Sequence, residues 1–355
     1  MKFRLDRKNL ASKQRGMTLV EIMIAATISL ILLAGVLQIF VSNKRTYQLN
    51  EAMSRLQENA RFALDVLTSD IRMAGFIGCM GSNNPSNFES ILADPTAYEF
   101  DLSNLLTGYD YTGSGWTPAL DSSFASDVVA GTDVIAMKHL SGDGVPLVSP
   151  YSDSAQLFVD PAAASALNEG EILMVTDCTQ GSVFQVTNLQ ESGGKLNVVH
   201  SNGGGFVPGN AAPAIFSNSY GADAKLAKLV STVYYIGTGA SGEPALFRRG
   251  LNRDTGTIAF EAHELVEGVE NMQILYGEVT GGSTKFVTAN NVTDMDNVVA
   301  IRVALLMKTV GDLGEVAASA DTDTYDLLGE TVDPSNDRVI RRVVSTTINI
   351  RNRGL

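Results

Sequence analysis

Residues that could do chemistry are few in this sequence, and their spacing matches no catalytic or cofactor-binding pattern. The chain of 355 residues has three histidines and two cysteines, without an HExxH motif or a metal-binding Cys/His spacing. It has no Gly-x-Ser-x-Gly turn that would expose a nucleophilic serine, and the glycines at 203–205 are expected to form a loop. We therefore expect no enzymatic activity and no cofactor. His139, His200 and His263 are expected at the surface or hydrogen-bonded in the core.

The most metal-like string runs from Asp321 to Asp326. Its carboxylates at the first, third and sixth positions could bind a hard cation. It lacks the glycine at position six and the glutamate at position twelve that an EF-hand has. We therefore predict no metal site and interpret the string as a solvated acidic loop, part of an acidic insertion over residues 312–336. Calcium binding is the alternative that the sequence leaves open.

Glu21 is the one ionisable residue with an unusual setting, because it directly precedes an apolar run. Residues 22–43 carry no charge, and about 22 residues at 1.5 Å each would span roughly 33 Å, enough to cross a hydrocarbon core of about 30 Å. A carboxylate carried to the bilayer centre costs about 2.5 to 3.5 kcal/mol, and is usually kept only where it finds a partner. We expect Glu21 at the cytoplasmic edge of a membrane span.

The sixteen residues before this run are strongly basic, with six lysines and arginines against Asp6 alone. By the positive-inside rule they place the N-terminus in the cytoplasm and the remainder outside, although Lys44 and Arg45 flank the far end. An ordinary secretory signal has a shorter apolar region and a small-residue cleavage site beyond it. Here the basic segment meets the apolar run at Gly16.

The string from Arg15 to Glu21 resembles the class III prepilin leader of type IV pilins and related pseudopilins. The resemblance implies that a prepilin peptidase cuts after Gly16 and methylates the new N-terminus, Met17, where most members have Phe. It also implies that Glu21, the fifth mature residue, pairs with the α-amine of Met17 in a neighbouring subunit. Because that amine is absent before cleavage, cleavage would permit assembly. The alternative is a plain signal anchor with an interfacial glutamate.

The helical pattern continues beyond the span and then gives way to strands. Apolar residues recur at three- and four-residue steps from Met53 to Ile71, and Gly75 and Gly78 supply a stop. We predict one helix over 17–74. We divide the chain that follows the leader into a transmembrane segment at 17–43, an amphipathic segment at 44–78 and a β-rich globular domain at 79–355. Strands are predicted at 133–140, 171–177, 183–189, 196–200, 227–236, 269–279, 298–308 and 338–350.

Residues 81–130 contain few periodic apolar residues, which predicts a long variable loop from helix to sheet. Such loops are uncommon unless functional or disordered, so we predict an exposed, partner-facing surface. The alternative is a variable insertion packed on the sheet. Five arginines between 338 and 353 are interpreted as the solvated face of an edge strand, with docking onto an acidic neighbour as the alternative.

Cys79 and Cys178 are the two cysteines, and an even count in a chain outside the cytoplasm favours a disulfide. Closing a loop of about 100 residues could stabilise the fold by up to about 4.7 kcal/mol in the chain-entropy model. Two buried free thiols are the alternative. The net charge of −13, about −18 without the basic leader, argues against nucleic acid as a partner of the body.

Three further segments make the resemblance more specific. Residues 57–79, 265–277 and 341–353 look like the PilW-type minor pilins of type IV pili. The resemblance implies an α+β, pilin-like fold, with a long N-terminal helix packed on an antiparallel β-rich domain. It implies a subunit of the inner membrane with a periplasmic body that joins other minor pilins, the major pilin and a tip adhesin to prime the fibre. The alternatives are a minor pseudopilin of a type II secretion system and, less favoured, a membrane-anchored periplasmic enzyme or binding protein.

Overall fold

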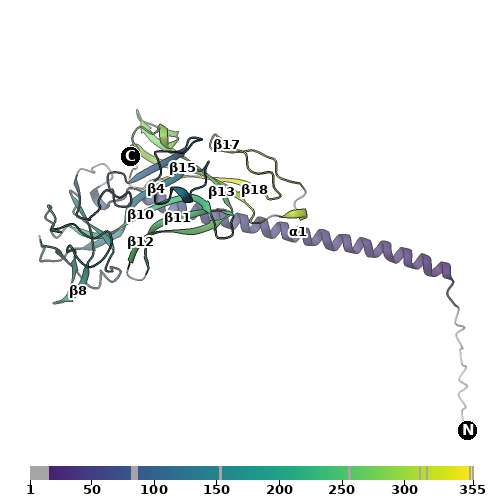
Figure 1. Cartoon of the computed structure of the whole chain (residues 1–355), viewed down its shortest axis with the longest axis horizontal. Helices are drawn as coiled ribbons and strands as arrows, with labels where there is room; N and C mark the ends of the chain where they lie inside the picture. The colour runs from purple at the N-terminus through teal and green to yellow at the C-terminus, as the bar shows by residue number, and fades with distance from the viewer. Residues whose placement is uncertain are drawn as a thin grey trace, which may run out of the picture. The chain divides into compact units, whose positions relative to one another are not determined.

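The computed structural model describes residues 16–80, 87–151, 154–254, 257–311, 313–316, 319–351 and 353. The chain divides into two units, residues 1–51 and residues 52–355. Figure 1 shows the long helix α1 and the β-rich body that follows it in the sequence.

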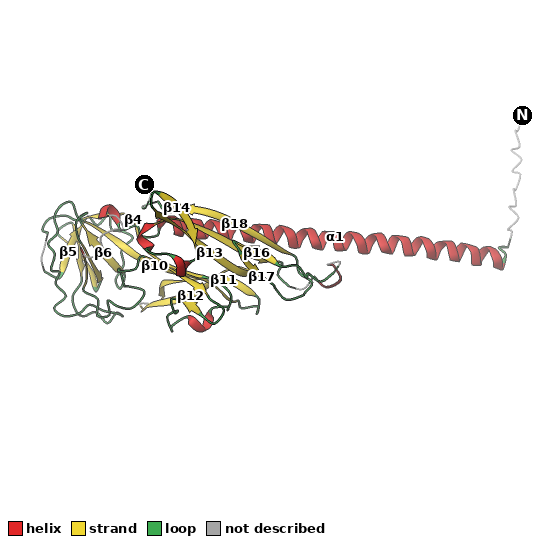
Figure 2. Ribbon diagram, turned by 90° about the horizontal axis from the view of Figure 1, so that it is seen from above, coloured by secondary structure: helices red, strands yellow, loops and turns green. Residues whose placement is uncertain are grey.

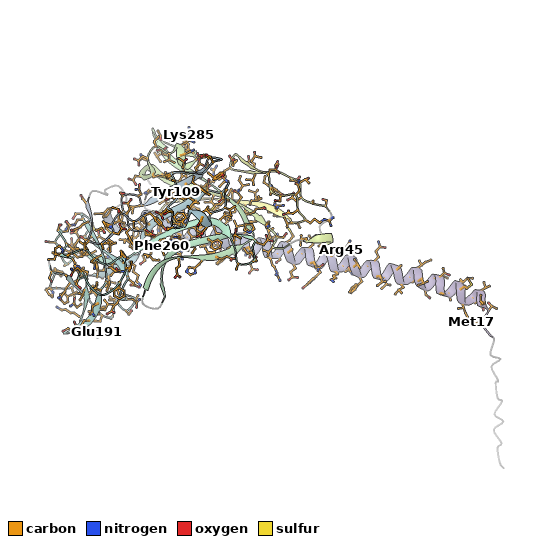
Figure 3. All side chains as sticks on the ribbon, viewed as in Figure 1. Met17, Arg45, Tyr109, Glu191, Phe260 and Lys285 are labelled. Carbon is orange, nitrogen blue, oxygen red and sulfur yellow. A yellow bond between two sulfur atoms is a disulfide. The ribbon has the colours of Figure 1, made fainter. Side chains whose placement is uncertain are left out.

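Helix α1 spans Leu19–Met73 and confirms the predicted helix to within two residues at its start and one at its end. Within the first unit, its residues 22–43 carry no charge, and all residues from 19 to 48 are exposed. Figure 3 shows side chains on all sides of the helix between the labelled Met17 and Arg45. Among the described residues, α1 is the one helix long and apolar enough to cross a membrane.

Within the second unit, the same helix becomes amphipathic. Leu56, Ala60, Ala63, Leu67 and Ile71 are buried at steps of three and four residues, which places them on one helix face. Leu64, predicted on this stripe, is half-buried beside Ala63 and packs against the same core. The predicted amphipathic face is therefore confirmed.

A nine-stranded sheet forms one layer over this helix face. Its strands, in spatial order, are β1 (Phe88–Ser90), β7 (Gly181–Gln185), β6 (Ile172–Thr176), β10 (Lys225–Thr238), β4 (Val134–Pro146), β2 (Leu106–Tyr111) and β3 (Trp116–Thr117), with β11 (Pro244–Asp254) on β10 and β12 (Thr257–Glu267) on β11. All pairs are antiparallel except β1 with β7. Strand β10 changes partner along its length, from β6 to β11.

A four-stranded antiparallel sheet covers the helix from the other side. Its order is β14 (Ser283–Val287), β13 (Val269–Thr280), β15 (Val298–Lys308) and β18 (Arg341–Asn349). Ile301, Val303, Leu305 and Met307 face the helix, as their alternation predicts. The opposite face of β15 is buried as well, because the hairpin of β16 (Tyr325–Leu327) and β17 (Glu330–Val332) packs Leu327 against it.

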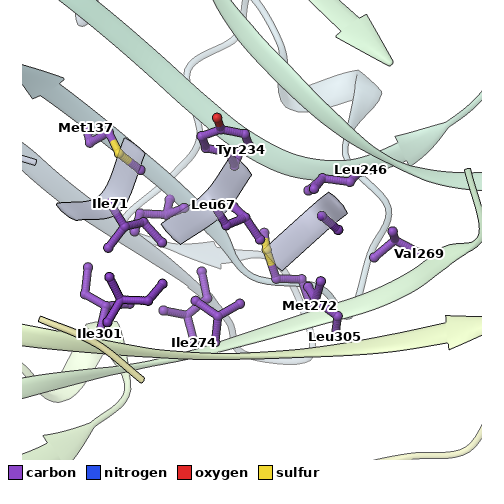
Figure 4. Close-up of a cluster of buried hydrophobic side chains, with 14 of the residues drawn as sticks. Leu67, Ile71, Met137, Tyr234, Leu246, Val269, Met272, Ile274, Ile301 and Leu305 are labelled. Carbon is purple, nitrogen blue, oxygen red and sulfur yellow. The ribbon is translucent and has the colours of Figure 1, made fainter. Parts of the chain in front are cut away.

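The main core lies where the two sheets enclose the helix. Figure 4 shows Leu67 and Ile71 of α1 between Met137, Tyr234 and Leu246 of the larger sheet and Ile274, Ile301 and Leu305 of the smaller one. A helix buried by two sheets at once loses more apolar surface to water than one packed on a single sheet. This enclosure fixes the helical part of the second unit in the body.

A third sheet lies at the end of the body that holds β6, as Figure 2 shows with β5 and β6 side by side. It consists of β5 (Gln156–Val159), β9 (Lys195–Val199) and β8 (Asn188–Ser192), and it shares an apolar cluster with β6, β7 and β10 of the larger sheet. Short 3-10 helices connect the strands: η1 (Gly78–Met80), η3 (Ala125–Asp127), η4 (Ala289–Asn291), η5 (Met295–Asn297) and η6 (Gly314–Val316). The fold is α+β, as predicted.

The prediction of an exposed loop over residues 81–130 is wrong for its described part, 87–130. This segment supplies β1, β2 and β3, and β2 pairs with β4 in the larger sheet. Its buried residues are Ile91, Leu92, Phe100, Leu102, Leu105, Leu106, Tyr109, Phe124 and Val128. They show no period because short strands and turns deliver them to four separate clusters. The segment is an insertion packed on the sheet.

Candidate functional site at the start of the apolar helix

The first turn of α1 is organised by Thr18 and Glu21. The Thr18 backbone N–H donates to Glu21 Oε2 at 2.9 Å, and the Thr18 hydroxyl donates to the same oxygen at 3.1 Å. In return, the Glu21 N–H donates to Thr18 Oγ1 at 3.3 Å. This reciprocal arrangement is a capping box, in which residue N3 and the N-cap satisfy each other's free backbone donors.

The capping box gives Glu21 a role that our sequence-based reasoning missed, although the Thr-x-x-Glu spacing is a readable signal. A negative charge in the first helical turn is also favoured by the helix dipole. The two bonds to Glu21 both end on Oε2, while a carboxylate has two oxygens and about four acceptor positions. The cap therefore leaves room at the carboxylate for a further donor or cation.

Gly16 and Met17 precede this cap in an exposed, non-helical segment. A Cβ atom placed on Gly16 would meet no atom within 4 Å. Packing in the described structure thus gives no reason for glycine at this position. Met17 has 69 % of its surface exposed. Residues 1–15, which include the basic residues of the predicted leader, lie outside the described residues.

Cys79 and Cys178 form the disulfide that the sequence predicts. The bond joins η1, directly after the helix, to the turn that follows β6. The two cysteines are 99 residues apart in sequence, so the bond ties the segment after helix α1 to the larger sheet. Among the described residues no cysteine is free.

The acidic string at Asp321 is engaged with a buried arginine. Asp321 Oδ2 accepts from Arg341 Nη1 at 3.1 Å and from the Tyr325 hydroxyl at 2.8 Å. Arg341 also binds Glu270 and Asp337, and its side chain has no exposed surface. No group of three or more His, Cys, Asp or Glu side chains within the described ranges is arranged to hold a metal ion.

Two of the five C-terminal arginines contradict the prediction of a solvated face. Arg341 and Arg353 are 5 % and 7 % exposed. Arg353 donates to the backbone oxygen of Met295 and lies 3.3 Å from a carboxylate oxygen of Asp296. Strand β18 is an edge strand, as predicted, yet its first arginine points inward to carboxylates from other elements.

His200 also differs from the expectation of a hydrogen-bonded core histidine. It is fully buried, and neither ring nitrogen has a hydrogen-bond partner among the described residues. Its ring stacks on Phe216 with centroids 4.2 Å apart. Burial lowers the pKa of His200 to about 4, so it acts as a neutral aromatic side chain.

Two family models match this chain at opposite ends. Residues 11–37 match the prokaryotic N-terminal methylation motif, and residues 233–352 match the model described as type IV pilus-assembly protein W. The C-terminal third of the chain is therefore similar to the PilW-type pilins, and its N-terminus carries the methylation motif. The leader string and the segment 265–277 fall inside these matches, as does the segment 341–353 except for its last residue. The likeness seen in residues 57–79 falls outside them and stays a prediction.

Two individual proteins are similar to this chain. The pilin-like protein PilA3 of Thermus thermophilus is 28% identical over 134 residues, which are 37% of this chain and 58% of the relative. The match thus spans less than two thirds of that relative. A solved type IV-like pilin from Thermus thermophilus is 17% identical, with a TM-score of 0.23, over 52% of this chain and 85% of the other. A score that low says nothing about a shared arrangement.

The leader motif and the exposed apolar helix together indicate a membrane-anchored pilin. The similarity of both ends to pilins indicates a structural subunit.

Proposed function

We propose that this chain is a PilW-type minor pilin that helps to prime a type IV pilus at its tip. The match of the N-terminal methylation motif across the start of an exposed apolar helix carries the proposal. Prepilin peptidase cuts between Gly16 and Met17 and methylates Met17. The uncut chain waits in the inner membrane with its body in the periplasm, and the cut chain joins other minor pilins, the major pilin and a tip adhesin.

In this proposal Glu21 acts as an electrostatic contact between subunits. Its carboxylate forms an ion pair with the protonated α-amine of Met17 in a neighbouring subunit, while the apolar parts of the helices pack together. A charge in an apolar layer is tolerable when it is paired. The amine exists only after cleavage, so processing precedes assembly.

The capping box raises a competing explanation, in which Glu21 only starts the helix. Three substitutions separate the two roles. Glu21→Gln keeps a side chain that can close a capping box but removes the charge. Glu21→Ala removes both, and Thr18→Ala removes the hydroxyl of the cap while it keeps the charge.

Each variant is expressed in a strain that lacks the chromosomal copy, and sheared surface fibres are quantified by immunoblot. N-terminal sequencing of the membrane-extracted protein checks for a start at methylated Met17. We expect all three variants to be cut, both Glu21 variants to lose fibre assembly, and Thr18→Ala to retain it.

If Glu21→Gln still assembles fibres and Thr18→Ala does not, Glu21 acts only as a capping residue. This result would refute the electrostatic contact. An N-terminus still at Met1 in mature fibres would refute the processing step. Intact fibres with lost protein secretion would assign the subunit to a type II secretion machinery instead.

A further inference from the structure

A cavity of about 320 Å³ opens where strand β10 changes partner. This volume is at the lower end of the range for small-molecule sites. Its lining includes Ile172, Lys228, Leu229, Thr232, Arg248 and Leu251. They come from β6, β10 and β11, so we call this cavity the fork pocket.

The fork arises from the strand registers. Strand β10 pairs with β6 through residues 225–228 and with β11 from residue 232 onward. Residues 229–231 lie between these two ladders, and on their other side they pair with β4. The larger sheet therefore divides at this point, and the fork pocket lies between β6 and β11.

Backbone groups of β10 are directed into the fork. Leu140 and Lys138 of β4 donate their N–H groups away from β10, to the carbonyls of Phe76 and Leu105 at 2.7 and 2.8 Å. In an antiparallel ladder, their opposite residues, Leu229 and Ser231, must then turn their own N–H and C=O groups away from β4. That direction leads into the fork pocket.

Two buried polar atoms at the pocket have no hydrogen-bond partner in the described structure. Thr232 is 1 % exposed, and its hydroxyl is unpartnered. The Nε of Arg248 is buried and unpartnered too, although the Nη2 of the same side chain lies 3.4 Å from Asp70. Buried donors left without acceptors are costly, so these two atoms point to a missing acceptor.

Gly250 leaves the space in which such an acceptor would sit. It lies opposite Thr232 in the β10–β11 ladder, and Arg248 is two residues further along on the same face. A Cβ atom on Gly250 would stand 4.0 Å from the Thr232 hydroxyl and 3.5 Å from the Ser231 carbonyl oxygen. Any longer side chain there would fill the pocket.

We propose that the fork pocket binds a small organic acid with one carboxylate and a short apolar body. The carboxylate accepts from Arg248 Nε and the Thr232 hydroxyl, and the apolar part contacts Ile172, Leu229 and Leu251. Lys228 lies at the rim in an ion pair with Glu171 at 2.7 Å, so it adds no net charge there. Charge-assisted bonds to an arginine favour a carboxylate over a neutral acceptor.

The test uses the full chain in detergent micelles and measures binding of butyrate by calorimetry and ligand-observed NMR. Butyramide is the matched neutral probe. We expect saturable binding of butyrate in the millimolar range, and binding at least about tenfold weaker for butyramide. Thr232→Val and Gly250→Leu should each weaken butyrate binding by a similar factor, and exposed Thr284→Val should leave it unchanged.

Gly250→Ala is the milder variant if Gly250→Leu lowers the melting temperature, because its Cβ makes only ordinary contacts. Absence of saturable binding, equal binding of butyramide, or unchanged binding in both Thr232→Val and Gly250→Ala would each overturn the proposal. An acetylated dipeptide acid is the last probe. If it binds and butyrate does not, the pocket takes a peptide terminus and the small-acid proposal is wrong.

Discussion

Substitution of Arg341 by methionine should be the most damaging single change in the body. The guanidinium makes five hydrogen bonds to three carboxylates: two to Glu270 at 2.6 and 3.0 Å, two to Asp337 at 2.7 and 3.0 Å, and one to Asp321 at 3.1 Å. A guanidinium has five N–H donors, so its capacity is used in full. The three acids come from separate elements, and Arg341 holds them together.

The magnitude follows from burial. The Arg341 side chain has no exposed surface, and the side chains of Asp321, Glu270 and Asp337 are 10%, 19% and 35% exposed. Removing one partner of a buried ion pair costs about 3 to 5 kcal/mol, because the other charge stays buried and unpaired. With three carboxylates left close together, we expect the upper end, about 5 kcal/mol. In a body of about 300 residues that corresponds to a fall in melting temperature of about 8 °C.

The measurement is urea unfolding and differential scanning calorimetry of Arg341→Met beside Arg342→Met. Arg342 is the next residue of the same strand and is exposed, so its loss should change the free energy of unfolding by less than about 0.5 kcal/mol. Arg341→Lys should fall between the two, since an ammonium cannot form the paired bonds of a guanidinium. Neutralising all three acids with Gln and Asn should restore much of the stability of Arg341→Met. A loss below about 1 kcal/mol in Arg341→Met would refute this reasoning.

Two further predictions concern the body. Burial raises the pKa of Asp133 to about 7, against the opposing effect of hydrogen bonds from the Ile274 and Tyr111 backbone N–H groups. This pKa lies above the value of about 3.9 for Asp in the unfolded chain. The contribution of protonated Asp133 to the free energy of unfolding is therefore fully present below about pH 4. It is lost as the pH rises to about 7, by up to about 4 kcal/mol. Asp133→Asn should therefore flatten the pH dependence of unfolding across that window, which urea titrations at several pH values would measure; a difference from wild type that stays constant with pH would contradict it. Replacing Cys79 and Cys178 together by serine should lower the free energy of unfolding by up to about 4.7 kcal/mol, and reduction of the wild-type protein should reproduce the loss. Equal stability of oxidised and reduced protein would argue against this contribution.

The parts of the fold that could be predicted are those with a strong apolar period. Helix α1 and strands β13 and β15 have such a period, because each buries a continuous face in one core. The hairpin of β11 and β12 was missed, since arginines at 248, 249 and 253 and glutamates at 261, 264 and 267 interrupt its apolar residues. Pairing with β10 compensates for that weak local pattern, and pairing is not visible in a local window.

Burial of Arg341 was out of reach for a related reason. Two adjacent arginines in a strand look solvent-exposed, and the acids that pair with Arg341 lie 4, 20 and 71 residues away in sequence. The fork pocket depends likewise on where two ladders end along one strand. In each case, the side chain's environment is set by residues that the chain brings together only in three dimensions.

At the N-terminal site, by contrast, the local sequence indicated two roles for Glu21. A carboxylate before an apolar run indicated a charge contact, while the Thr-x-x-Glu spacing indicated a helix cap. The two roles are compatible, because the cap occupies Oε2 and orients the carboxylate before any neighbour arrives. An oriented acceptor loses less conformational freedom when it binds a cation. Thr18→Ala should therefore slow assembly more than it lowers the final amount of fibre, whereas Glu21→Gln should abolish both.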